Sequence, residues 1–194
     1  MPSAVVSLLD PVHTAKVERI WDDLRKHLGL SGVLVTPWPH FSYQVATGYS
    51  NRAELEALLQ QFAAQTAPFA IRTSGLGSFP EPFPVVYVAV AKNPALAALH
   101  ASLWSRVDPL ANGGVPYYRP DRWTPHITLA HGDTRTETPL NRSEVGGIMK
   151  RLENRDFSWE VSIDNVALIW DRDGTEELSR RFHLRGRTGV RTHH

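Results

Sequence analysis

One short phrase occurs twice in this chain, and it restricts the folds that the chain can adopt. Residues 39–42 read Pro-His-Phe-Ser, and residues 125–128 read Pro-His-Ile-Thr. In a β-strand, residues i and i+2 point to the same face of the sheet. Each phrase therefore directs an imidazole and a hydroxyl to one side and turns a large apolar residue into the core. A chain that repeats such a strand is expected to contain two similar halves.

The repeat continues downstream of both phrases. Residues 51–54 read Asn-Arg-Ala-Glu and residues 141–144 read Asn-Arg-Ser-Glu, and each segment opens a predicted helix. An Asn with Glu three residues later is typical of a capping box, in which the two side chains satisfy N–H groups of the first turn. Its recurrence after a histidine-containing strand in both halves indicates an internal duplication.

The domain organisation follows from this duplication. The Gly- and Pro-rich residues 75–84 mark the predicted seam between the halves. We predict one bilobal domain over residues 1–194, with a first lobe at about 1–80 and a second at about 81–194. Terminal strands are allowed to exchange between the two lobes.

Hydrophobic spacing predicts the elements of each half. Strands are predicted over residues 4–9, 33–45, 69–78, 85–91, 126–130, 157–170 and 177–185, and helices over residues 13–27, 53–65, 93–107 and 142–152. The extended stretch 33–45 is expected to be broken by Pro37 and Pro39. Residues 111–124 are predicted as a loop and residues 171–174 as a hairpin turn. Two similar sets of strands and helices predict an α+β (α/β-like) fold with two pseudo-symmetric sheet-and-helix lobes and a central cleft between them.

Composition excludes several classes of protein. The formal net charge is only +1 over 194 residues, which argues against a protein that coats long nucleic acid. The chain has no cysteine, so disulfides, thiolate nucleophiles and zinc–sulfur sites are excluded, and a reducing cytoplasm is the expected location. No apolar run approaches the roughly 20 residues of a membrane helix. We predict a cytoplasmic monomer that does not bind membranes.

The two His-x-Ser/Thr pairs suit phosphoester chemistry. Imidazole has an ordinary pKa of about 6.5, so one histidine can accept a proton while another donates one. His40 and His126 are the candidates for these roles. The hydroxyls of Ser42 and Thr128 can hydrogen-bond the non-bridging phosphate oxygens, whose charge grows in the transition state.

Metal chemistry is less favoured by the pattern. The sequence has no His-Glu-x-x-His motif and no cysteine, so neither a metal site nor a cofactor is predicted. His131 lies five residues after His126, which predicts that it faces away from His126, in a loop. The other internal histidines are predicted to be surface or structural residues: His13, His27, His100 and His183.

The loop that enters the second motif carries weaker candidates. Tyr117, Tyr118 and Trp123 offer rings on which a nucleobase could stack, or they anchor the loop to the core. Arg119 and Arg122 offer contacts to phosphate, or they belong to a solvated loop. The sequence leaves both alternatives open.

These motifs resemble those of the two-histidine (2H) phosphoesterase superfamily, which includes the bacterial 2′-5′ RNA ligase and cyclic nucleotide phosphodiesterase families. The resemblance implies that His40 and His126 act as general acid and base and that Ser42 and Thr128 bind phosphate. Two positions depart from the usual pattern. Ser42 stands where Thr is commoner, and His131 stands where RNA-acting relatives often have a basic residue.

The resemblance and the motifs predict a metal-independent phosphodiesterase. Its expected substrate is a 2′,3′-cyclic phosphate at an RNA end or on a small nucleotide, or a related diester, with a weak 2′-5′ RNA ligase activity in the reverse direction. The alternative is a non-catalytic RNA- or nucleotide-binding module on the same fold. The sequence assigns neither histidine specifically as the acid or the base.

Overall fold

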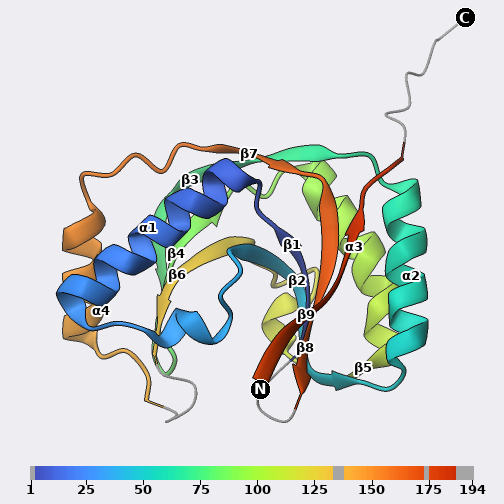
Figure 1. Ribbon diagram of the computed structural model, residues 1–194, viewed down its shortest axis with the longest axis horizontal. Coiled ribbons are helices and arrows are strands. Elements are labelled where there is room, and N and C mark those ends of the chain that lie inside the picture. Colours follow the sequence, from blue (N-terminus) through green and yellow to red (C-terminus); the bar gives the residue numbers. More distant parts are fainter. Residues whose placement is uncertain (1–2, 133–137, 173–174, 187–194) are drawn as a thin grey trace, which may run out of the picture.

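Two antiparallel sheets form the centre of the computed structural model, which describes residues 3–132, 138–172 and 175–186 (Figure 1). One sheet has the strand order β5-β2-β1-β8-β9 and the other has the order β6-β4-β3-β7. The strands are β1 (Ser3–Leu8), β2 (His40–Tyr49), β3 (Phe69–Phe79), β4 (Val85–Val90), β5 (Ala111–Gly114), β6 (His126–His131), β7 (Glu160–Ile163), β8 (Asn165–Arg172) and β9 (Thr175–His183). The predicted α+β class is confirmed.

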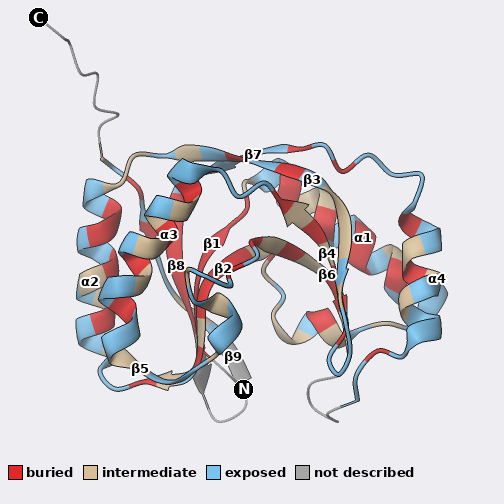
Figure 2. Ribbon diagram, turned by 180° about the vertical axis from the view of Figure 1, so that it is seen from behind, coloured by how far each residue is buried: buried red, intermediate tan, exposed pale blue. Residues whose placement is uncertain are grey.

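The helices cover the two sheets at opposite ends of the molecule (Figure 1). They are α1 (Pro11–Leu28), α2 (Arg52–Gln65), α3 (Pro94–Val107) and α4 (Arg142–Leu152), with short 3₁₀ helices η1 (Gly32–Val35), η2 (Asp108–Leu110) and η3 (Pro116–Tyr118). Helices α2 and α3 contact the five-stranded sheet, whereas α1 and α4 contact the four-stranded sheet. Figure 2 shows that the buried residues gather on the sheets and on the helix faces turned toward them.

Local sequence signals explain where the helices begin and end. Asn51 caps α2 by accepting from the Glu54 backbone N–H, and Asn141 caps α4 in the same way. In α4 the capping box is complete, because the Glu144 carboxylate also accepts from the Asn141 N–H at 2.7 Å. Helix α1 ends at Gly29, whose φ of 72° is left-handed and favours glycine.

The two halves exchange helices, which locks the sheets together. Helix α1 follows β1 of the five-stranded sheet but contacts β6 of the other sheet. Helix α3 follows β4 of the four-stranded sheet but contacts β2 of the first. One hydrophobic cluster consequently contains buried residues of both sheets and all four α-helices described here.

The sheets do not follow a cut at residue 80. Strand β3 pairs with β4 and β7, while β8 and β9 return from the end of the chain to pair beside β1. The division into lobes at about 1–80 and 81–194, with exchange of terminal strands between them, stays a prediction.

Three predicted segments are wrong in detail. Within residues 33–45, the part before Pro37 is not extended, because η1 covers Gly32–Val35; β2 begins after Pro39, at the expected break. Residues 111–124 contain the short strand β5, which pairs with the far end of β2. The stretch 157–170 is divided into β7 and β8 at Asp164. Residues 173–174 of the predicted hairpin turn lie outside the described residues, although Arg172 and Thr175 on either side are paired.

None of the described helices is both long and apolar enough to cross a membrane.

Candidate active site

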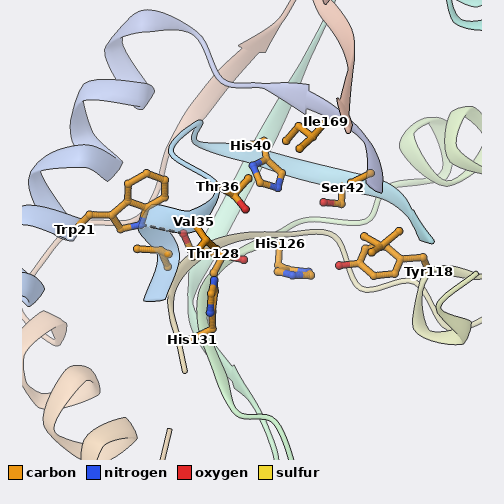
Figure 3. Close-up of a pocket in the computed structure, with 13 residues that line it drawn as sticks. Trp21, Val35, Thr36, His40, Ser42, Tyr118, His126, Thr128, His131 and Ile169 are labelled. Carbon is orange, nitrogen blue, oxygen red and sulfur yellow. Dashed lines mark hydrogen bonds between the residues drawn. The ribbon is translucent and has the colours of Figure 1, made fainter. Parts of the chain in front are cut away.

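A pocket of about 220 Å³ lies where β2 of one sheet approaches β6 of the other. Both His-x-Ser/Thr pairs line it, and we call it the histidine pocket. Figure 3 shows His40 and Ser42 along β2 and His126 and Thr128 along β6 on the opposing wall. The structure thus brings together the four residues that the sequence singled out. Their catalytic and phosphate-binding roles stay predictions.

Both imidazoles are held in the same way. Nδ1 of His40 lies 2.6 Å from the Trp38 carbonyl oxygen, and Nδ1 of His126 lies 2.8 Å from the Thr124 carbonyl oxygen. A carbonyl only accepts, so Nδ1–H is the donor and Nε2 carries the lone pair of the neutral ring. In each case the accepting residue precedes a proline, which biases it toward an extended backbone. The repeated proline thus places the carbonyl that orients each histidine.

Each motif is followed by a β-bulge. Val6 pairs with Ser42 but Val5 pairs with Gln44, so Tyr43 is the extra residue in β2. In β6 the extra residue is Leu129, because the β4 partners of Thr128 and Ala130 are adjacent in sequence. An extra residue reverses the alternation of faces beyond it. The bulge is therefore part of the internal repeat.

The bulges change which side chains face the pocket, including that of His131. Val45 and His131, each five residues after a motif histidine, line the histidine pocket instead of facing away. His131 is also the last residue of β6 and not a loop residue. Strict alternation would put Gln44 on the face of His40, but Gln44 is buried, and its Nε2 donates to Asp108 Oδ1 at 3.1 Å. Simple alternation could not reveal these placements.

Two tryptophans support the motifs crosswise. The Trp123 indole N–H donates to the Ser42 carbonyl at 2.9 Å, and the Trp21 indole N–H donates to the Thr128 carbonyl at 3.3 Å. Each acceptor precedes a bulged residue, and each donor belongs to the other half of the repeat. Sequence reasoning missed Trp21, which also lines the pocket. Its signal would have been a tryptophan on the buried stripe of α1.

Burial disfavours a positive charge on both motif histidines. Desolvation lowers the pKa of His40 to about 4, and nearby His126 and His131 also disfavour a charge there. Desolvation likewise lowers the pKa of His126. Burial raises the pKa of Tyr118 to about 12, so its hydroxyl remains protonated and can donate a hydrogen bond.

The weaker candidates separate into different environments. Tyr118 lines the histidine pocket, whereas Trp123 is buried and stacks on His100 with 3.8 Å between ring centroids. Trp123 therefore anchors the loop and presents no open ring face to a nucleobase. Tyr117 is exposed, and Arg119 is an exposed residue paired with Asp121 at 3.4 Å. Neither of these two lines the histidine pocket.

The other histidines that the structure describes do not line the histidine pocket. His100 is fully buried, and its ring nitrogen lies 2.9 Å from the Tyr43 carbonyl. His13 is buried beside the Asp10 carboxylate, while His27 and His183 lie near surface aspartates. Within the described residues, no group of three or more histidine, aspartate or glutamate side chains is placed to hold a metal ion.

Comparison with known proteins decides the family. The sequence profile of the 2′-5′ RNA ligase superfamily matches residues 11–175. The chain belongs to the 2′-5′ RNA ligase superfamily. Relatives named "Putative phosphoesterase" occur in Bacillus cereus strain AH820, 27% identical over 75% of this chain and 78% of that protein, and in Bacillus anthracis strain A0248, 28% identical over 83% and 86%. The predicted resemblance to the two-histidine phosphoesterases is confirmed.

Two solved structures share the fold of this chain. The protein TT0787 of Thermus thermophilus aligns over 97% of this chain and all of its own, with a TM-score of 0.64 and 23% identity. LigT of Escherichia coli complexed with 3′-AMP aligns over 95% and 99%, with a TM-score of 0.55 and 20% identity. Because the alignments cover nearly the whole chain, the shared fold includes both sheets.

Proposed function

We propose that this protein is a metal-independent phosphodiesterase that hydrolyses a 2′,3′-cyclic phosphate on an RNA end or a small nucleotide. The observation that carries the proposal is the meeting of both His-x-Ser/Thr pairs in one pocket. LigT, which shares the fold, has been crystallised with ATP and with 3′-AMP, which supports a nucleotide ligand here. The lack of cysteine supports action in a reducing cytoplasm.

The proposed reaction needs one neutral and one protonated imidazole. Nε2 of the neutral histidine accepts a proton from water as the water oxygen bonds to phosphorus. The other histidine, as imidazolium, gives its proton to the ribose oxygen as the P–O bond breaks, and a phosphomonoester results. The Ser42 and Thr128 hydroxyls donate to the non-bridging oxygens, where negative charge accumulates. When a 5′-hydroxyl takes the place of water as the nucleophile, the same two proton transfers open the cyclic phosphate and leave a 2′-5′ diester and a free 3′-hydroxyl, which is the weak 2′-5′ RNA ligase activity.

Binding of the anionic substrate raises the lowered pKa of the histidine that must be protonated. In the free protein the pKa of His40 is about 4 and that of His126 is lowered, so both rings are neutral near pH 7. A bound phosphate diester carries a negative charge, which favours an imidazolium beside it and raises its pKa. Substrate binding is thus coupled to uptake of the proton that the reaction uses.

The test is hydrolysis of a panel of 2′,3′-cyclic nucleotides and 2′-5′-linked dinucleotides in the presence of a chelator. His40→Ala and His126→Ala are each expected to lower kcat by about 100- to 10,000-fold, because each removes one proton-transfer group. Ser42→Ala and Thr128→Val are expected to lower it by about 10- to 1,000-fold. The control is His183→Ala, a surface histidine distant from the pocket lining.

The outcomes separate the enzyme from the alternative. Turnover that survives the chelator and disappears in both histidine variants supports the proposal. Binding of cyclic nucleotides without turnover by the unaltered protein would assign it instead as a nucleotide-binding module. Turnover that persists in His40→Ala and His126→Ala would contradict general acid–base catalysis by these two histidines.

A further inference from the structure

A lysine outside the histidine pocket bonds the main chain of the loop that enters the second motif. Lys92 lies between β4 and α3, and its Nζ donates to the Pro120 carbonyl at 3.1 Å and to the Trp123 carbonyl at 2.9 Å. These two residues belong to one turn, which the Trp123 N–H closes by donating to the Arg119 carbonyl at 2.8 Å. Hydrogen bonds from a charged donor are roughly twice as strong as neutral ones. One ammonium group thus joins two carbonyls of the turn.

The segment that Lys92 holds reaches both motifs. The Trp123 indole N–H donates to the Ser42 carbonyl of the first motif at 2.9 Å. The next residue, Thr124, supplies the carbonyl that lies 2.8 Å from Nδ1 of His126 in the second motif. A displacement of the Trp123 main chain would therefore move the group that orients His126.

The two orienting carbonyls differ in how they are held. Trp38, whose carbonyl orients His40, packs against a hydrophobic cluster on the five-stranded sheet. Thr124, which has the same role for His126, is exposed. Packing of its own side chain fixes the first carbonyl but does not fix the second. The contact from Lys92 to the residue before Thr124 supplies a fixed point on that side.

The place of Lys92 in the chain is not explained by the helix that follows it. Asn93 is the N-cap of α3, and its side chain accepts from the Leu96 N–H. Lys92 directly precedes this cap, at the positive end of the helix dipole, where a cation is disfavoured. The residue is also exposed, so burial does not account for it. Its bonds to the loop are the contacts that explain a lysine at this position.

We infer that Lys92 is a positioning residue that holds the Trp123 main chain so that the Thr124 carbonyl orients His126. The effect on catalysis rests on the proposed function. Lys92 does not line the histidine pocket, so it acts through the loop and not on the substrate. Its loss is expected to change the geometry of proton transfer and therefore kcat, with little effect on KM.

The kinetic test replaces Lys92 by Met, which keeps the aliphatic chain and removes the charge and the donors. For a 2′,3′-cyclic nucleotide, kcat is expected to fall by about 5- to 100-fold, since a small misplacement at a catalytic centre costs up to about 100-fold. Lys92→Arg keeps a charged donor and should retain most of kcat. The matched control is Lys16→Met, which removes a lysine of α1 that lies 5.3 Å from the centroid of the Trp159 ring.

A spectroscopic test needs no turnover. Long-range ¹H–¹⁵N NMR spectra near pH 7, where both motif rings are neutral, report which ring nitrogen carries the proton. In the unaltered protein His40 and His126 should both show the Nδ1–H tautomer. In Lys92→Met the His126 ring should become a mixture with the Nε2–H tautomer, whereas His40, an internal control, should stay as it was. Lys92→Arg and Lys16→Met should change neither ring.

The two tests separate failure of the inference from failure of the proposed function. If the unaltered protein hydrolyses no cyclic nucleotide, the proposed function fails, and a change confined to the His126 ring in Lys92→Met still supports the positioning role. The positioning role is overturned if the His126 ring keeps its tautomer in Lys92→Met, whether or not kcat falls. It is also overturned if both histidine rings change equally, which would indicate a general loss of stability, or if KM rises while kcat does not change.

Discussion

Replacement of Trp123 by Phe isolates the hydrogen bond that supports the first motif. The Trp123 side chain is 2% exposed, and its N–H donates to the Ser42 carbonyl at 2.9 Å. Phenylalanine keeps a ring against His100 but removes the donor. A buried carbonyl without a partner costs about 1–3 kcal/mol, and the smaller ring leaves a cavity worth about 1 kcal/mol more. We expect the free energy of unfolding to fall by about 2–4 kcal/mol.

The loss is measurable by urea unfolding and by heat. For a chain of this size, 1 kcal/mol lowers Tm by about 2–4 °C, so a decrease of roughly 4–16 °C is expected. The matched variant is Trp21→Phe, which removes the corresponding donor from the Thr128 carbonyl. That bond is longer, at 3.3 Å, and a smaller loss is expected.

A catalytic measurement separates positioning from stability. At a temperature where both proteins are fully folded, Trp123→Phe should lower kcat on a cyclic nucleotide. A shift of the Ser42 backbone carbonyl also moves the Ser42 hydroxyl that is proposed to bind phosphate. If Trp123→Phe unfolds as the unaltered protein does, the Ser42 carbonyl does not depend on the indole and the argument is refuted. If stability falls but kcat does not, the tryptophan only fills space.

Three further predictions concern buried polar groups and pH. Thr73 donates to the Phe157 carbonyl and accepts from the Trp159 N–H at 2.7 Å, so Thr73→Val should cost about 2–3 kcal/mol in urea unfolding while Thr73→Ser costs less; equal losses would contradict this account. The pKa of buried His100 is about 4 in the folded state, below the ordinary 6.5, so the unfolded chain takes up the proton first and stability should fall by about 3 kcal/mol as pH drops from 6.5 to 4. His100→Gln should have a flatter profile, and an unchanged slope would exclude this group as the cause. Sulfate, whose charge is fixed over this range, should bind more tightly as pH falls from 7 toward 4.5, because the anion raises the lowered pKa of the motif histidines; calorimetric affinity that is independent of pH would count against the coupling.

Local sequence signals were sufficient for much of the fold. The helix caps at Asn51 and Asn141 are contacts over three residues, so the sequence predicted where α2 and α4 begin. The alternation of His40 and Ser42 with a buried Phe41 predicted which face each residue takes. Both signals depend only on neighbours in the chain and on the geometry of one helix or strand.

The errors arose where pairing with another strand changed the local geometry. The bulge at Leu129 turns His131 into the pocket, and it is defined by the register against β4, not by any residue of β6 alone. In the same way, β5 has a sequence typical of a loop and becomes a strand because the end of β2 offers it a partner.

The sequence by itself predicted the residues on which the proposed chemistry depends. Two histidines with hydroxyls at i+2 share a strand face wherever the strands lie, because the side-chain period of a strand is two. The tertiary structure alone decided that β2 and β6 meet, that each motif carbonyl takes an indole N–H from the other half, and that Lys92 bonds the loop before His126. These contacts join segments that are distant in sequence. Their free energy therefore depends on how the whole core packs, and local sequence does not reveal it.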